Sequence, residues 1–104
     1  MTRLLMLLAL TGCGSIVYIN DVTRAATTSI DAARAAEADK YSPYYWTRAT
    51  EFLRKSRELA AHADMQAANR YGRLAAAAAQ LAEQEAIAAK QDPKSTVAPA
   101  KEPP

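Results

Sequence analysis

The sequence predicts an all-α fold: a helical hairpin or a small antiparallel three-helix bundle with coiled-coil-like packing. Alanine makes up about a quarter of the 104 residues, which is typical of helical sequences because alanine has the highest intrinsic helix propensity. Apolar residues recur at three- and four-residue spacing through the middle of the chain, as they do on one face of a helix. Runs of β-branched residues bounded by turn residues are absent, which argues against a β-rich fold.

The first helix is expected over about residues 21–40. Its apolar stripe consists of Val22, Ala26, Ile30 and Ala33, which follow helical spacing. Residues 13–20 are expected to form a cysteine followed by a tether, in which residues 16–19 could lie against a bilayer or start a helix.

Two further helices are expected over about residues 43–63 and 65–90. Ser42 and Pro43 are favoured at the N-cap and the first position of a helix, and Asp64 offers the next N-cap. The apolar residues of the second helix recur every seven positions, at Tyr45, Phe52 and Leu59. Proline and small residues without periodicity then predict a disordered tail over residues 91–104.

The third helix carries two seams with the spacing of packed helices, so it should have two neighbours. One seam consists of Ala67, Tyr71, Leu74, Ala78, Leu81, Glu85 and Ala88, and the other of the small residues Ala68, Gly72, Ala75, Ala79, Ala82, Ala86 and Ala89. Large aliphatic residues are few, so a lone bundle of this size should be marginally stable. We therefore expect self-association or an envelope protein partner along the small seam, with Gly72, Ala75 and Ala79 as contacts.

The N-terminal residues 1–12 have the organisation of a signal peptide. Arg3 supplies a positive charge, and Leu4–Leu10 is a short apolar run, well below the roughly 20 residues that span a bilayer. The run ends in Leu10, Thr11, Gly12 and Cys13, which resembles the bacterial lipobox. The alternative is a secreted protein cut after Gly14 or Ser15.

The lipobox resemblance implies that Cys13 is acylated, becomes the first residue of the mature protein and anchors it in a membrane. Gly14, rather than aspartate, follows the cysteine, which by the same resemblance implies the outer membrane, with the protein facing the periplasm. Cys13 is the only cysteine in the sequence, so it has no partner for a disulfide within the chain.

The segment 32–86 resembles an alanine-rich helical-hairpin domain of unknown function that occurs in envelope lipoproteins of Gram-negative bacteria. The resemblance rests on Tyr41-Ser42-Pro43 after an alanine-rich stretch, on Ala49, Leu53 and Ala60, and on Tyr71 with the alanines that follow it. It implies a helical hairpin in the periplasm without an attached activity. Some members carry an OmpA-like domain after the hairpin, whereas this sequence continues into a proline-rich tail, so we expect no peptidoglycan binding through a recognisable domain.

Composition and motifs argue against several function classes. The net charge is +2 and basic residues are mixed with acidic ones, so nucleic-acid binding through a basic patch is not expected. His62 is the only histidine, which leaves no residue set for a metal site. No nucleophile motif is present. We expect a non-catalytic protein without cofactor or metal.

An aromatic cluster, comprising Tyr41, Tyr44, Tyr45 and Trp46, is the most distinctive candidate for a surface contact. Tyr45 and Trp46 are expected to pack on the core side, whereas for Tyr41 and Tyr44 packing and partner contact are equally consistent with the sequence. The sequence therefore predicts a structural or adaptor module that acts through helix–helix contacts, with Tyr41, Tyr44 and Trp46 as further contact residues. The alternatives are a glycan- or small-ligand-binding module that uses this cluster, or an unlipidated periplasmic chaperone.

Overall fold

The computed structural model describes residues 14–92, with side chains from residue 20 onward, and this part of the chain is all-α. Four helices follow one another: α2 (Gly14–Ala35), the short α3 (Ala38–Tyr41), α4 (Pro43–Ala61) and α5 (Met65–Gln91). Residues 14–92 contain no strand, so the predicted fold class is confirmed. Among the described helices, none combines the length and the apolar character needed to cross a membrane.

The first helix differs from the prediction at both ends. It begins at Gly14, so the expected tether is helical, and of the two expectations for residues 16–19 the start of a helix is confirmed. It ends at Ala35 because Glu37 adopts the left-handed conformation, with φ 62°, which a right-handed helix cannot continue through. The Glu37 carbonyl accepts hydrogen bonds from the Lys40 and Tyr41 amides, and these bonds start α3.

The boundaries of α4 and α5 follow the predicted capping residues, with one difference in chemistry. Pro43 opens α4 as predicted, but the Ser42 hydroxyl makes no capping bond and donates instead to the Glu85 carboxylate on α5, at 3.2 Å. Asp64 caps α5 as predicted, since its Oδ1 accepts from the Ala67 amide at 3.2 Å. Between these helices, Ala63 takes a left-handed conformation with φ 61° and reverses the chain.

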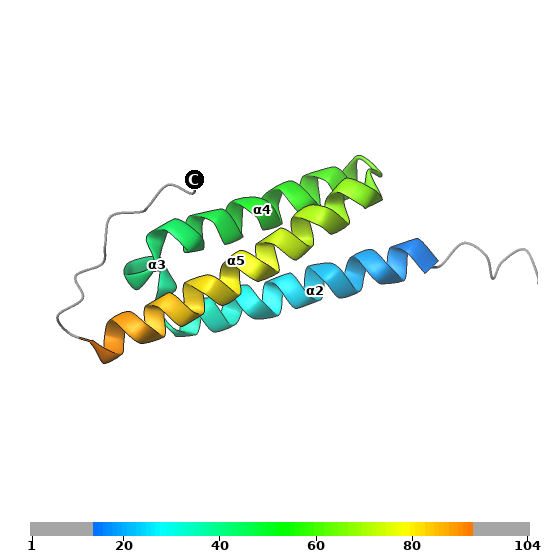
Figure 1. Ribbon diagram of the computed structural model, residues 1–104. Helices are drawn as coiled ribbons and strands as arrows, with labels where there is room; N and C mark the ends of the chain where they lie inside the picture. The colour runs from blue at the N-terminus through cyan, green and yellow to red at the C-terminus, as the bar shows by residue number, and fades with distance from the viewer. Residues whose placement is uncertain (1–13, 93–104) are drawn as a thin grey trace, which may run out of the picture.

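The three long helices form an up-down-up arrangement in which α5 has the central role (Figure 1). α4 and α5 form an antiparallel hairpin, and α2 runs parallel to α5 along its other side. α5 packs extensively against both α4 and α2, whereas α2 and α4 contact each other much less. The prediction that the third helix has two neighbours is therefore confirmed.

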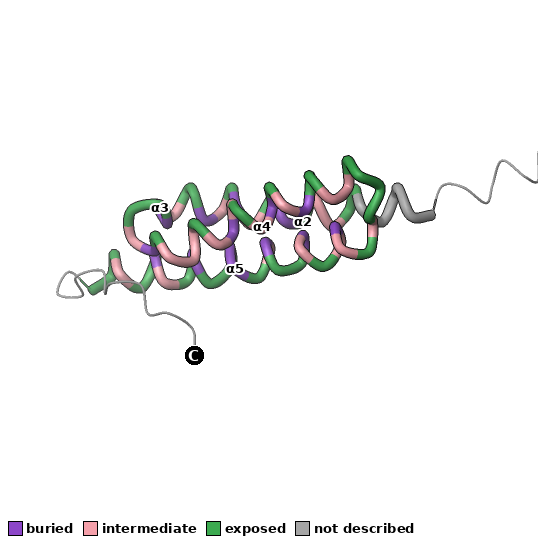
Figure 2. Tube along the Cα trace, turned by 90° about the horizontal axis from the view of Figure 1, so that it is seen from above, coloured by how far each residue is buried: buried purple, intermediate pink, exposed green. Residues whose placement is uncertain are grey.

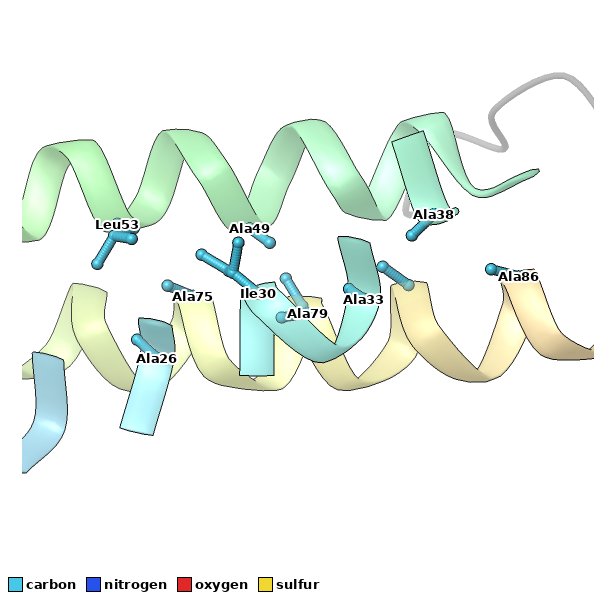
Figure 3. Close-up of a cluster of buried hydrophobic side chains, with 11 residues drawn as sticks. Ala26, Ile30, Ala33, Ala38, Ala49, Leu53, Ala75, Ala79 and Ala86 are labelled. Carbon is cyan, nitrogen blue, oxygen red and sulfur yellow. The ribbon is translucent and has the colours of Figure 1, made fainter. Parts of the chain in front are cut away.

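Buried residues lie on the faces of the helices that turn toward one another (Figure 2), and most of them are alanines. Of the predicted stripe of α2, Ala26, Ile30 and Ala33 are buried and Val22 is half-buried. Ile30 projects between α4 and α5 (Figure 3), where it and Leu53 of α4 are the large aliphatic members of the described core. Small side chains let the helix axes approach closely, since the interaxial distance depends on the residues at the contact.

Candidate interaction surface

The residues of the predicted lipidation motif, Leu10, Thr11, Gly12 and Cys13, lie outside the described part of the chain. The structure does describe the backbone that follows them, and α2 begins at Gly14. An anchor at Cys13 would therefore be joined to the helical bundle without an intervening loop.

The small-residue seam of α5 faces the interior of the bundle. Gly72, Ala75 and Ala79 are all buried, with Ala75 and Ala79 at 0% exposure. The prediction that these three residues contact an external partner is wrong, because α2 and α4 of the same chain already cover them. The small residues of this seam therefore let α2 and α4 of the same chain pack closely against α5.

Gly72 marks the point where the three long helices converge. A Cβ atom at this position would lie 2.5 Å from Cγ1 of Val22 on α2 and 3.3 Å from Oγ of Ser56 on α4. The Ser56 hydroxyl is itself buried, at 1% exposure, and donates to the Ala68 carbonyl of α5 at 2.6 Å. Glycine is thus required at this contact for space, and a buried hydrogen bond fixes α4 to α5 beside it.

The predicted aromatic cluster divides among different partners, although the rings of Tyr44 and Tyr45 contact each other edge to face, with their centroids 5.0 Å apart. Tyr41 lies on α3 beside Lys90 of α5, whose Nζ is 5.6 Å from the ring centroid, and Trp46 lies beside Arg34 of α2 at the same distance from its guanidinium carbon. Tyr41 and Trp46 pack against the core and are half-buried. Tyr44 instead packs against Arg48 of its own helix.

Tyr44 begins a row of three rings and one guanidinium group that crosses from α4 to α5. The Arg48 guanidinium lies 5.5 Å from the Tyr44 ring and 5.1 Å from the Phe52 ring, and it donates to the Tyr44 hydroxyl at 3.0 Å. The Phe52 ring is then 5.9 Å from the ring of Tyr71 on α5. All four side chains are half-buried, and such contacts between rings and cations stabilise the α4–α5 hairpin.

The outer face of α5 exposes large apolar side chains, which the sequence analysis missed. Leu74 and Leu81, predicted to lie in a packed seam, remain 41% and 46% exposed, whereas Tyr71 and Ala78 of the same seam do pack inward. On a straight helix, residues seven positions apart differ by about 20° in direction around the helix axis. α5 turns its alanine seam toward both α2 and α4. Leu74 and Leu81 therefore lie at the outer edge of the surface that α5 buries against these two helices.

Charged groups on the surface are engaged mainly along their own helices. Arg54 contacts Glu51 at 2.8 Å and Glu58 at 3.8 Å, and the hydrogen bond and negative charge of Glu51 raise the pKa of the Arg54 guanidinium above its already high value. An ion pair between elements joins Lys90 of α5 to Glu37 at 3.2 Å. These mostly exposed pairs contribute little to stability individually.

Two open hollows lie on the described surface. One of about 260 Å³ lies between α2 and α4 and is lined by Ile30, Arg34, Thr50, Leu53, Arg54 and Arg57. The other, of about 400 Å³, lies by the start of α5 and is lined by Asp64, Gln66, Ala67, Arg70 and Arg73. Within residues 14–92, no three histidine, cysteine, aspartate or glutamate side chains are grouped so that they could hold a metal ion.

Among the side chains that the structure describes, the large apolar residues that stay exposed are Leu74, Leu81 and Ile87, and all three lie on α5. No protein family, no curated protein and no solved structure matches this chain.

Proposed function

We propose that this protein is a membrane-anchored, non-catalytic lipoprotein of the cell envelope that acts as a structural or adaptor module through helix–helix contacts. The observation that carries the proposal is the exposed apolar face of α5, where Leu74 and Leu81 lie on the outside of a bundle that has already packed its small residues internally. Exposed apolar groups of this kind on a helix favour contact with another helix.

The anchor in this proposal is Cys13, which directly precedes α2. Two or three acyl chains on one residue hold a protein at a bilayer far more firmly than a single chain. Because α2 begins at Gly14, the bundle would be held close to the bilayer surface. The start of α2 and the turn between α4 and α5 lie at the same end of the bundle (Figure 1), so the anchor would be attached at this end and the bundle would lie along the bilayer.

We place the protein at the outer membrane, facing the periplasm, on the basis of the lipobox resemblance and of Gly14 after the cysteine. Membership of the alanine-rich hairpin domains of envelope lipoproteins is part of the same proposal. Use of the aromatic cluster as a glycan site has weaker support, because Tyr41, Tyr44 and Trp46 pack against three different cationic side chains rather than forming a shared platform.

Metabolic labelling with palmitate, followed by membrane fractionation, tests the anchor. We expect the wild-type chain to carry the label and to appear in the outer-membrane fraction, and Cys13→Ser to lose both properties. Ser15→Ala is the matched control, since it changes a neighbouring residue and should keep the label. Label that persists in Cys13→Ser, or an unlabelled wild-type chain in the soluble fraction, would contradict the proposal.

A further inference from the structure

The exposed face of α5 has a spacing that suits contact with another long helix. Leu74 and Leu81 are seven residues apart, so they lie two helical turns apart on one side. Ala77 lies between them and is also exposed, which leaves room for a second helix to approach. The third large exposed apolar residue of α5, Ile87, is six residues beyond Leu81 and therefore points about 120° away from it.

We infer that this face of α5 binds the same face of a second copy of the chain in antiparallel orientation. A twofold axis between Ala77 and Ala78 places Leu74 of one copy at the level of Leu81 of the other, and the reverse. Such a contact is self-complementary, as a twofold interface must be. Small residues lie at the axis and one leucine pair lies on each side of it.

The charges of α5 favour the antiparallel orientation. Arg70 lies in the first half of the helix and Glu85 in the second, and the same axis brings Arg70 of one copy to the level of Glu85 of the other. A parallel pair would place like charges side by side, which is destabilising. The hydrogen bond from Ser42 holds the Glu85 carboxylate in place at this level.

The size of the contact indicates a weak dimer that depends on the membrane. α5 has 27 residues, so it is about 40 Å long, and one helix face of this length buries on the order of 400 Å² per copy, about half of the roughly 800 Å² of a standard interface. Two bundles that lie along one bilayer, with the twofold axis normal to it, keep both anchored ends at the surface, and this confinement raises the effective concentration of the chains. The inference therefore rests on the proposed lipid anchor.

Cysteine cross-linking of the full chain in its native membrane tests this arrangement. In the antiparallel pair, two copies of Ala77→Cys lie next to each other across the axis, whereas two copies of Ala88→Cys lie about 30 Å apart along it. A short bis-maleimide should therefore give a covalent dimer of Ala77→Cys and none of Ala88→Cys. Both positions are exposed, so both thiols react with a monofunctional maleimide. The wild-type chain, whose Cys13 is blocked by acylation, provides the baseline.

Introduction of negative charge into the leucine face supplies the second arm. Leu74→Glu with Leu81→Glu, in the Ala77→Cys background, should reduce the covalent dimer at least about tenfold, the effect of roughly 1.4 kcal/mol. Ile87→Glu is the matched control, because Ile87 is equally exposed at 42% but points elsewhere, and it should leave the yield unchanged. Circular dichroism should show the same helix content in all variants.

Several results would overturn the second-copy inference. They are a monomeric Ala77→Cys chain, equal yields from Ala77→Cys and Ala88→Cys, a product whose mass is not twice that of the chain, or a dimer that survives the double glutamate substitution. Palmitate labelling of the same membranes separates the two claims. A labelled chain without the dimer refutes only this inference, whereas an unlabelled chain refutes the proposed anchor.

Discussion

Replacement of Gly72 by alanine tests whether α2 packs on α5 as closely as the structure indicates. The new Cβ atom would lie 2.5 Å from Val22 Cγ1, well inside van der Waals contact, and Val22 is β-branched and therefore restricted in a helix. Overpacking of this kind costs about 1–3 kcal/mol. Alanine also gains about 1 kcal/mol over glycine in a helix interior, so Gly72→Ala should change stability by between about zero and −2 kcal/mol.

A double-mutant cycle with Val22→Ala separates the two contributions. Val22→Ala removes the Cγ1 atom, and in this background Gly72→Ala should stabilise the protein by about 1 kcal/mol, its helix-propensity gain. The contact with Ser56 Oγ at 3.3 Å is the same in both backgrounds and cancels. We therefore expect a coupling free energy of about 1–3 kcal/mol between residues 22 and 72.

Urea denaturation followed by circular dichroism measures all four proteins of the cycle. The full chain with Cys13→Ser as a common background keeps lipidation from varying among them. Unfolding midpoints and slopes give each free energy of unfolding, and an unchanged slope shows that the variants differ in stability alone. If Gly72→Ala stabilises both backgrounds equally, α2 does not approach α5 at this point and the packing described above is wrong.

The remaining predictions concern the helix cap of α5, a buried and an exposed leucine, and the ion pair at the end of α5. Asp64→Ala should lower the free energy of unfolding by about 0.5–2 kcal/mol, whereas Asp64→Asn should stay within a few tenths, because asparagine also caps a helix; thermal melts distinguish them. Leu53→Ala should cost about 2–5 kcal/mol in urea denaturation, since Leu53 is only 7% exposed, while Leu81→Ala should cost less than about 1 kcal/mol. Lys90→Gln removes the ion pair with Glu37, so hydrogen exchange should speed up locally around α3 while global stability falls by less than about 1 kcal/mol.

The sequence predicts the helices and their inner faces well, because local propensity and periodicity determine both. Composition and spacing correctly placed Ala26, Ile30 and Ala33 in the core, and Asp64 at the start of α5. The break at Glu37 was missed, since no glycine or proline marks this left-handed position. In the structure, hydrogen bonds from the Lys40 and Tyr41 amides to the Glu37 carbonyl and an ion pair with Lys90 accompany this conformation.

The interaction surface was harder to predict than the core because it depends on the relative rotation of the helices. Both seams of α5 have the same spacing, so periodicity alone does not tell which one faces inward. The close contact at Gly72 decides the rotation, and it turns Leu74 and Leu81 outward. Glycine within an all-small seam was the available signal that this seam makes a close helix contact.

The most direct test of the central claim is mass spectrometry of the mature chain purified from its native membrane. The proposed lipoprotein predicts a polypeptide that begins at Cys13 and carries acyl chains on that residue, so its intact mass should equal that of residues 13–104 plus the lipid. Fragmentation should place the added mass on the first residue. A mature chain that begins elsewhere, or an unmodified Cys13, would contradict the account.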